Sequence, residues 1–223
     1  MGTTVELTAS DGHQLGAYLA EPAGAPRGGI VIGMEMYGVN DYLKSVCEKY
    51  AAAGYAAIAP ALFDREEKDL VLPYDSEGMR RGKEISHAVN YDHVLDDVTA
   101  AASHIASVGK VAISGYCFGG TITWLSACRC DFDAAIAYYG SNMCDFPDEE
   151  AQCPIISHVG DLDTAVPPAD VAMFKAKRPE VDWYIYEGIQ HGFDSHVRPE
   201  RYSAEASALA WGRTQDFMAQ HIG

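Results

Sequence analysis

The chain has 223 residues, of which 48% are hydrophobic and 22% charged, and its formal net charge is −16. This length and composition are typical of a soluble globular protein, so we expect residues 1–223 to form a single domain. A strongly negative surface repels the phosphates of nucleic acids and anionic membranes, and therefore neither is an expected partner.

The start of the chain predicts an antiparallel hairpin. Residues 4–9 and 14–20 have strand-like sequences, and the Asp11-Gly12 pair between them is a strong turn signal. The next segment, GGIVIG at 28–33, is apolar and predicts a buried strand.

The rest of the chain alternates helices and strands. Asn40 or Asp41 is suited to cap a helix that ends near Gly54. Strands are predicted at 55–62, 110–116, 134–140, 154–160 and 181–187, and helices from about 77, from 91 to about 107, and at 118–128, 168–177 and 203–221. This alternation indicates a mainly parallel sheet with helices on both faces.

Neither a membrane span nor a secretory signal is expected. No stretch approaches the ~20 apolar residues that cross a bilayer, and the first residues lack a basic region followed by an apolar run. The cysteines are scattered, which is typical of reduced thiols in the cytoplasm. They are Cys47, Cys117, Cys128, Cys130, Cys144 and Cys153. Since no second pair accompanies Cys128 and Cys130, a zinc site is not expected.

The sequence GYCFGG, residues 115–120, is the sharpest motif. It lies where a predicted strand turns directly into a helix. A turn of the form G-x-nucleophile-x-G exposes its central residue above the sheet edge, and the helix N-terminus favours a thiolate at Cys117. The alternative is that Cys117 is a packing cysteine and the glycines only shape a turn.

Two further segments favour the catalytic interpretation of Cys117. The strand at 154–160 is followed by Asp161 and Asp163, and the strand at 181–187 is followed by His191. Nucleophile, acid and histidine therefore occur in the order of a hydrolase triad, each after a strand. A lone aspartate or histidine in such a loop is more often structural, but three in this order favour catalysis.

The chain resembles the dienelactone hydrolase family (carboxymethylenebutenolidases) over nearly its whole length. The matching segments are SDGHQLGAYLAEP, MEMYGVN, GYAAIAPALF, KVAISGYCFGG, AYYG, HVGDLDTAVP and HGF. The resemblance implies an α/β-hydrolase fold with Cys117 as nucleophile, His191 as base and Asp163 as the orienting acid. Asp163 is preferred because it lies four residues before Pro167, as the family's acid does.

The resemblance also assigns roles around the nucleophile. It implies that Glu35 holds the resting cysteine and releases it as a thiolate when substrate binds. The alternative, a solvated loop carboxylate, fits poorly with the neighbours Met34 and Met36. The backbone N–H groups of Met36 and Phe118 are the implied oxyanion donors.

Members of this family bind a substrate carboxylate with two arginines, and the present sequence departs from the family pattern at these positions. Arg80 or Arg81 fits the first position, with the register open. Four residues after His191, where the second arginine is expected, stands Ser195. Arg198 lies three residues further on and is interpreted as a surface residue. The departure puts the diene-lactone substrate itself in doubt and leaves other acyl substrates open.

These observations favour a hydrolase of small esters or lactones that uses no cofactor and no metal. We expect a monomer or a weak homo-oligomer. A glutamine amidotransferase is a rival, but it would place Glu two residues after the histidine, where this chain has Phe193. A redox sensor or a non-hydrolytic ligand-binding relative is the second rival, and it would not need a complete triad.

Overall fold

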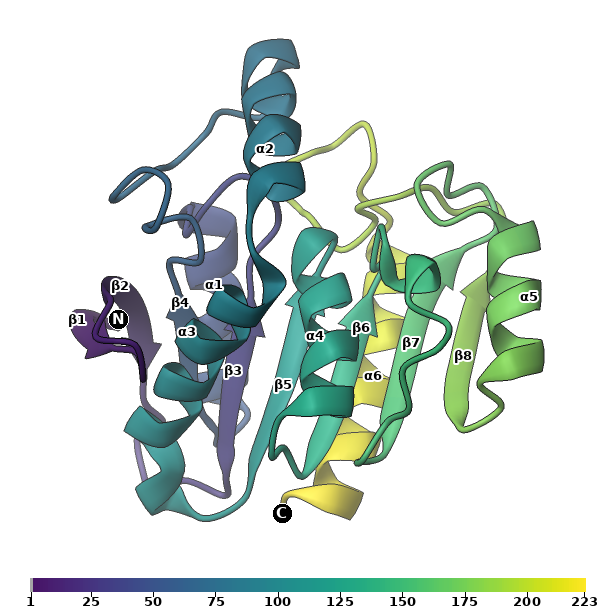
Figure 1. The fold of residues 1–223 in the computed structure, drawn as a ribbon. Helices are drawn as coiled ribbons and strands as arrows, with labels where there is room; N and C mark the ends of the chain where they lie inside the picture. Colours follow the sequence, from purple (N-terminus) through teal and green to yellow (C-terminus); the bar gives the residue numbers. More distant parts are fainter. Residues whose placement is uncertain (1) are drawn as a thin grey trace.

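The computed structural model describes residues 2–223 and is built on an eight-stranded sheet (Figure 1). In space the strands follow the order β1-β2-β4-β3-β5-β6-β7-β8. They are Thr3–Thr8 (β1), Gln14–Ala20 (β2), Gly29–Gly33 (β3), Ala56–Pro60 (β4), Val111–Tyr116 (β5), Ala134–Tyr138 (β6), Ile155–Gly160 (β7) and Val181–Tyr186 (β8). The β1–β2 and β2–β4 pairs are antiparallel and the others are parallel. The predicted sheet with its N-terminal hairpin is thereby confirmed.

Helices cover both faces of this sheet, as predicted. They are Asp41–Ala52 (α1), Ser76–Ala88 (α2), Tyr91–Ile105 (α3), Phe118–Arg129 (α4), Pro168–Lys177 (α5) and Ala204–His221 (α6). Figure 1 shows α3, α4 and α5 on one face and α1 and α6 on the other, while α2 stands beyond the ends of the strands. None of the helices within residues 2–223 combines the length and apolarity that a membrane crossing requires.

The central strands are buried along their whole length. Every residue of β3, β4, β5, β6 and β7 is buried. Their runs of Ala, Val and Ile follow from this position, because a parallel strand covered on both faces has no solvent side on which polar residues could alternate. The edge strand β1 is largely exposed and carries Thr and Glu.

Helix ends differ from the predictions in small ways. Of the two residues suggested as the cap of α1, Asn40 is the one that caps it, and its side chain accepts a hydrogen bond from the Leu43 N–H at 3.0 Å. The helix α2 begins at Ser76 because Asp75 caps it by accepting from the Gly78 N–H. The helix α3 stops at Ile105 and tightens into a 3₁₀ turn (η1, Ala106–Val108), a common way for an α-helix to end.

The carboxyl ends of the parallel strands meet at one edge of the sheet. The loops that leave this edge carry Glu35 after β3, Cys117 after β5, Tyr139 after β6, Asp163 after β7 and His191 after β8. Ligands bind at this edge in open α/β sheets. The topology therefore brings together residues that are as much as 156 positions apart, counted from Glu35 to His191.

Candidate active site

Cys117 occupies a sharp turn between β5 and α4. Its φ of 55° lies in the left-handed region, which is strained for any residue except glycine. The turn needs glycines because the backbones approach closely: a Cβ atom at Gly115 would lie 1.9 Å from the Gly119 carbonyl oxygen, and one at Gly119 would lie 2.2 Å from that of Gly33. The sequence GYCFGG thus folds into an elbow that places Cys117 at the N-terminus of α4.

His191 is held by a carboxylate. Its Nδ1 lies 2.8 Å from Oδ2 and 3.1 Å from Oδ1 of Asp163. The Asp163 carboxylate is fixed in turn by the backbone N–H groups of Ala165 and Val166, which donate at 2.8 and 3.0 Å. Asp161, the other candidate acid, instead accepts from the Gly188 N–H at 2.7 Å.

The charge around His191 favours its protonated form. Burial opposes the imidazolium, but the negative charge of Cys117 and hydrogen bonds with Asp163 and Cys117 outweigh it and raise the pKa of His191 to about 10. The arrangement therefore suits an imidazolium next to a thiolate, with the carboxylate on the far side of the ring.

A second strained residue lies beside the histidine. Tyr139 has a φ of 41° and is fully buried, and its ring centroid lies 5.0 Å from that of His191 at an interplanar angle of 64°. Its N–H donates to the carbonyl oxygen of His158 at 2.8 Å, and its hydroxyl lies 3.4 Å from that of Tyr42. Strain at two neighbouring strand ends is typical of a functional edge.

Cys117 and His191 line one cavity of about 330 Å³, which also contacts Glu35, Met36 and Phe118. The backbone hydrogen bonds of the turns, loops and helix caps in residues 2–223 do not include one donated by the Met36 N–H or the Phe118 N–H. Both groups are therefore left without such a hydrogen bond, and their role as oxyanion donors stays a prediction.

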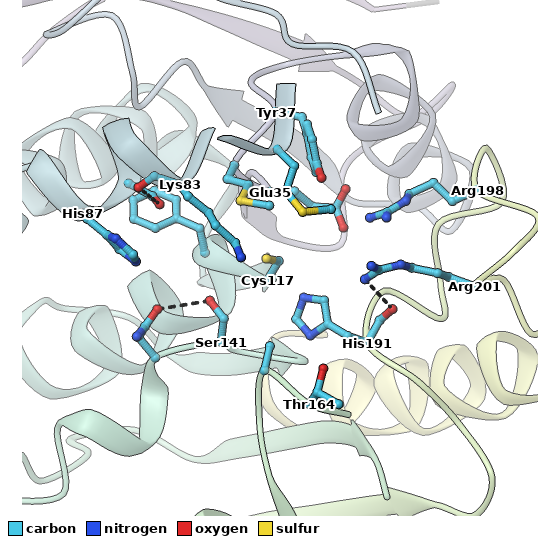
Figure 2. A pocket seen from close by; sticks show the side chains of 16 residues that line it. Glu35, Tyr37, Lys83, His87, Cys117, Ser141, Thr164, His191, Arg198 and Arg201 are labelled. Carbon is cyan, nitrogen blue, oxygen red and sulfur yellow. Dashed lines mark hydrogen bonds between the residues drawn. The ribbon is translucent and has the colours of Figure 1, made fainter. Parts of the chain in front are cut away.

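Glu35 is buried, with 3% of its surface exposed. Its Oε2 accepts a hydrogen bond from the Tyr74 hydroxyl at 2.7 Å, and Figure 2 shows its carboxylate turned toward Arg198. Burial raises the pKa of Glu35, against the hydrogen bond from Tyr74 and the positive charge of Arg198, which lower it. In this conformation the Glu35 carboxylate is directed away from Cys117 and does not hold it. Because Glu35 is buried, the alternative interpretation as a solvated loop carboxylate is wrong.

The arginines are placed differently from the prediction. Arg80 and Arg81 lie on the exposed side of α2, where Arg80 pairs with Glu77 and Glu84 and Arg81 pairs with Glu67 and Glu84. Neither contacts the cavity that contains Cys117. The prediction that one of them lines this cavity is therefore not confirmed; both side chains pair with acidic neighbours, and Arg80 lines a neighbouring cavity with Lys83, Arg198 and Arg201.

The cavity is instead lined by Arg198, Arg201 and, on α2, Lys83. Arg198 is only 6% exposed, so its interpretation as a surface residue is wrong. Figure 2 shows the two arginines on one side of Cys117 and Lys83 on the other. The cavity of this acidic protein is thus locally cationic.

Consecutive turns after His191 bring these arginines inward. The N–H of Ser195 donates to Gly192, that of Arg198 to Ser195, and that of Arg201 to Arg198. Residues spaced by three in such turns lie on one side of the chain. This spacing was the signal in the sequence that could have identified both arginines.

Arg198 has spare hydrogen-bonding capacity. Its guanidinium lies over the rings of Tyr74 and Tyr37, 5.1 and 5.8 Å from their centroids, and its Nε donates to Glu200 at 3.3 Å. Its two terminal nitrogens donate to no acceptor in the part of the chain that the structure describes. A buried guanidinium with free donors is suited to bind an anion.

No group of three His, Cys, Asp or Glu side chains in residues 2–223 is arranged to hold a metal ion. All six cysteines are free thiols.

Comparisons with known proteins identify the family of the chain. The model of the dienelactone hydrolase family matches residues 15–222. A carboxymethylenebutenolidase from Pseudomonas putida is 30% identical over 227 residues, which cover 96% of this chain and 95% of the relative. The crystal structure of a candidate dienelactone hydrolase from Klebsiella pneumoniae subsp. pneumoniae, 26% identical, superposes with a TM-score of 0.84 over 99% of this chain and 100% of that chain.

A more distant neighbour shows the fold alone. An α/β serine hydrolase from Xanthomonas campestris, 13% identical, superposes with a TM-score of 0.71 and covers 98% of this chain and 94% of that chain. The architecture is therefore that of the α/β hydrolases. With the match of the family model and the P. putida relative, we conclude that the chain is a hydrolase that belongs to the dienelactone hydrolase family.

Proposed function

We propose that the protein hydrolyses small esters or lactones that carry a carboxylate, with Cys117 as the nucleophile. One observation carries the proposal: Cys117 stands on a strained elbow in the cavity that also contains His191, and Asp163 holds that histidine at 2.8 Å. The combination is that of an activated nucleophile with an oriented base.

In the first step the thiolate of Cys117 attacks the carbonyl carbon of the substrate. The electron pair of the C=O bond moves to the oxygen, and the resulting oxyanion accepts hydrogen bonds from the Met36 and Phe118 N–H groups. When the oxyanion collapses, the bond to the leaving oxygen breaks and the His191 imidazolium donates its proton to that oxygen. The product of this step is an acyl thioester on Cys117.

In the second step water hydrolyses the thioester. Neutral His191 accepts a proton from the water, whose oxygen attacks the acyl carbon. Collapse of the second oxyanion breaks the C–S bond and releases the carboxylic acid, and the thiolate of Cys117 is restored next to the imidazolium. Throughout, Asp163 keeps the imidazole in the tautomer that faces the nucleophile with Nε2.

The charges of the cavity support a carboxylate on the substrate. The chain has a net charge of −16 and repels anions at long range. Arg198, Arg201 and Lys83 reverse this sign inside the cavity. The curated relative from P. putida is a carboxymethylenebutenolidase, and a carboxymethyl lactone carries such a group.

Glu35 is proposed to control the reactivity of Cys117. A thiol at a helix N-terminus next to an imidazolium is readily ionised and therefore open to oxidation. A negative charge close to the sulfur disfavours the thiolate. When Glu35 turns toward Cys117 the thiol is kept neutral, and when it turns toward Arg198 the thiolate is released.

The experiment is a panel of lactones, aryl esters and thioesters assayed with wild type and Cys117→Ala. We expect turnover of at least one class in the wild type, an acyl adduct on Cys117 in mass spectra taken with a slow substrate, and no turnover in the variant. Full activity of Cys117→Ala would refute the proposed nucleophile. Reversible oxidation of Cys117 without any turnover would favour the redox sensor instead.

A further inference from the structure

Tyr74 links the buried Glu35 to the cap of a helix. It lies in the loop between β4 and α2, and its hydroxyl donates to Glu35 Oε2 at 2.7 Å. The same hydroxyl oxygen accepts a hydrogen bond from the side-chain amide of Asn40 at 3.0 Å. Its ring lies 4.4 Å from that of Tyr37, measured between centroids.

In this series of hydrogen bonds, the direction of each bond follows from the direction of the bond before it. Asn40 Oδ1 accepts from the Leu43 N–H at the start of α1, so the amide nitrogen of Asn40 must face Tyr74. An amide nitrogen only donates. The single proton of the Tyr74 hydroxyl is therefore left for Glu35, and the helix cap orients the whole chain of donors toward the carboxylate.

This geometry sets the direction in which the carboxylate points. Figure 2 shows Glu35 directed to the side of Arg198 rather than to Cys117, and the guanidinium of Arg198 packs over the Tyr74 ring. A hydrogen bond to a carboxylate is among the stronger ones in proteins. Tyr74 therefore holds Glu35 away from the thiol, and the positive charge of Arg198 attracts the carboxylate to the same side.

We infer that Tyr74 is a positioning residue that holds Glu35 off Cys117 and thereby keeps the thiolate available to His191. The inference rests on the proposed function, in which Cys117 is the nucleophile and Glu35 controls it. It adds a residue outside the triad, on a different loop, that decides which of two directions the control carboxylate takes.

Alkylation of Cys117 by iodoacetamide at pH 7 tests this directly, because only the thiolate reacts. Tyr74→Phe keeps the ring and removes the donor, so Glu35 is free to turn toward the sulfur. We expect alkylation to slow about tenfold, the factor expected from the loss of a charge-assisted hydrogen bond. In the Glu35→Gln background, where no charge can approach the thiol, the same substitution should have no effect.

The other thiols do not interfere with this measurement. Burial raises the pKa of Cys128 and Cys144 to about 12 and that of Cys153 to about 11, and it also raises the pKa values of Cys47 and Cys130. They remain protonated at pH 7 and react slowly. Mass spectrometry of the peptide that contains Cys117 then reports the site alone.

The chain offers a matched control and a second variant. Tyr18 donates to Glu48 at 2.8 Å far from the cavity, so Tyr18→Phe removes a similar pair and should leave alkylation unchanged. Asn40→Asp keeps the helix cap but replaces the amide donor with an acceptor that competes for the Tyr74 proton. It should slow alkylation in the same direction, and it tests the proposal even if Tyr74→Phe folds poorly.

Wild-type or faster alkylation in a folded Tyr74→Phe variant would overturn the inference. Equal slowing in the Glu35→Gln background would overturn it too, because Tyr74 would then act on the cavity without Glu35. These outcomes can be told apart from a failure of the proposed function, because that failure would be seen as hydrolysis that persists in Cys117→Ala. Alkylation follows the thiol whether or not any ester is turned over.

Discussion

Two histidines with little exposure to solvent differ in every partner that matters for their charge. His191 faces the carboxylate of Asp163 and the sulfur of Cys117, and these raise its pKa to about 10 against the effect of burial. The ring nitrogens of His158, on β7, instead bond to the hydroxyls of Tyr186 and Thr214, at 2.9 and 3.1 Å, and the ring packs against those of Tyr138 and Tyr184. Burial, with the nearby positive charge of Arg213, lowers the pKa of His158 to about 3.

The comparison teaches that burial alone does not decide the state of a histidine. Both rings are largely removed from solvent, yet anionic neighbours favour the charged form of His191 and hydroxyl neighbours favour the neutral form of His158. The region of His191 is charged and open to a cavity. The region of His158 is a neutral network inside the sheet, in which Tyr138 and Thr214 also share a hydrogen bond of 2.7 Å.

Asp163→Asn should have the largest effect, because it gives His191 a neutral partner like those of His158. The amide of Asn can donate to Nδ1 and favour the wrong tautomer, so we expect kcat to fall about 10⁴-fold, as in a serine protease triad. Asp161→Asn is the matched control and should change kcat little, since the Asp161 carboxylate accepts from the Gly188 N–H and does not face His191. The reverse ranking in steady-state assays would show that Asp161 is the acid.

Arg198→Met tests whether the positive charge of Arg198 binds the substrate. The substitution keeps an apolar stem over Tyr37 and Tyr74 and removes the free donors. We expect KM for anionic esters to rise about 10- to 100-fold, in line with the loss of hydrogen bonds to a charged group, and KM for neutral esters to change far less. A rise of equal size for both classes would show that Arg198 supports the loop but does not bind the substrate.

The sequence predicted what depends on local motifs and on strand order. Cys117, Asp163 and His191 each follow a recognisable strand, so the parallel sheet alone brings them to one edge. The positions of Lys83, Arg198 and Arg201 around the cavity instead depend on how the loops and α2 pack. Arg80 and Arg81 had the expected place in the chain, but the face of α2 on which they lie turns toward Glu67 and Glu84.

Side chains that act through other side chains were the hardest to predict. Tyr74 lies in an irregular loop, where no periodicity indicates which way a residue points. Its role follows only from the hydrogen bonds to Glu35 and Asn40, which join segments 39 and 34 positions away in the chain. Arg201 differs from Tyr74, since the three-residue spacing of the tight turns after His191 could have indicated that it reaches the cavity.

His158 makes a prediction for stability in acid. Its pKa is about 3 in the folded protein, whereas an exposed histidine has an ordinary pKa of 6.5. The unfolded chain therefore binds more protons between these values, and stability falls as the pH drops below 6.5. The loss should reach about 2 kcal/mol at pH 5. Urea unfolding between pH 7 and pH 5 should show a shallower loss for His158→Gln than for the wild type, whereas parallel curves would show that His158 does not titrate in this range.

Thr214→Val should have the smallest effect on activity, because it changes the neutral network around His158 and leaves the charged residues around His191 in place. The valine keeps the shape of threonine but leaves His158 Nε2 and the Tyr138 hydroxyl without their shared partner. We expect the free energy of unfolding to fall by about 1–3 kcal/mol, the cost of unsatisfied buried polar groups. The kcat and KM values should stay unchanged, because nothing in this network touches the cavity that contains Cys117. A fall in kcat with unchanged stability would mean that the network of His158 reaches His191 through Tyr138 and Tyr139, and that the two histidines are not independent.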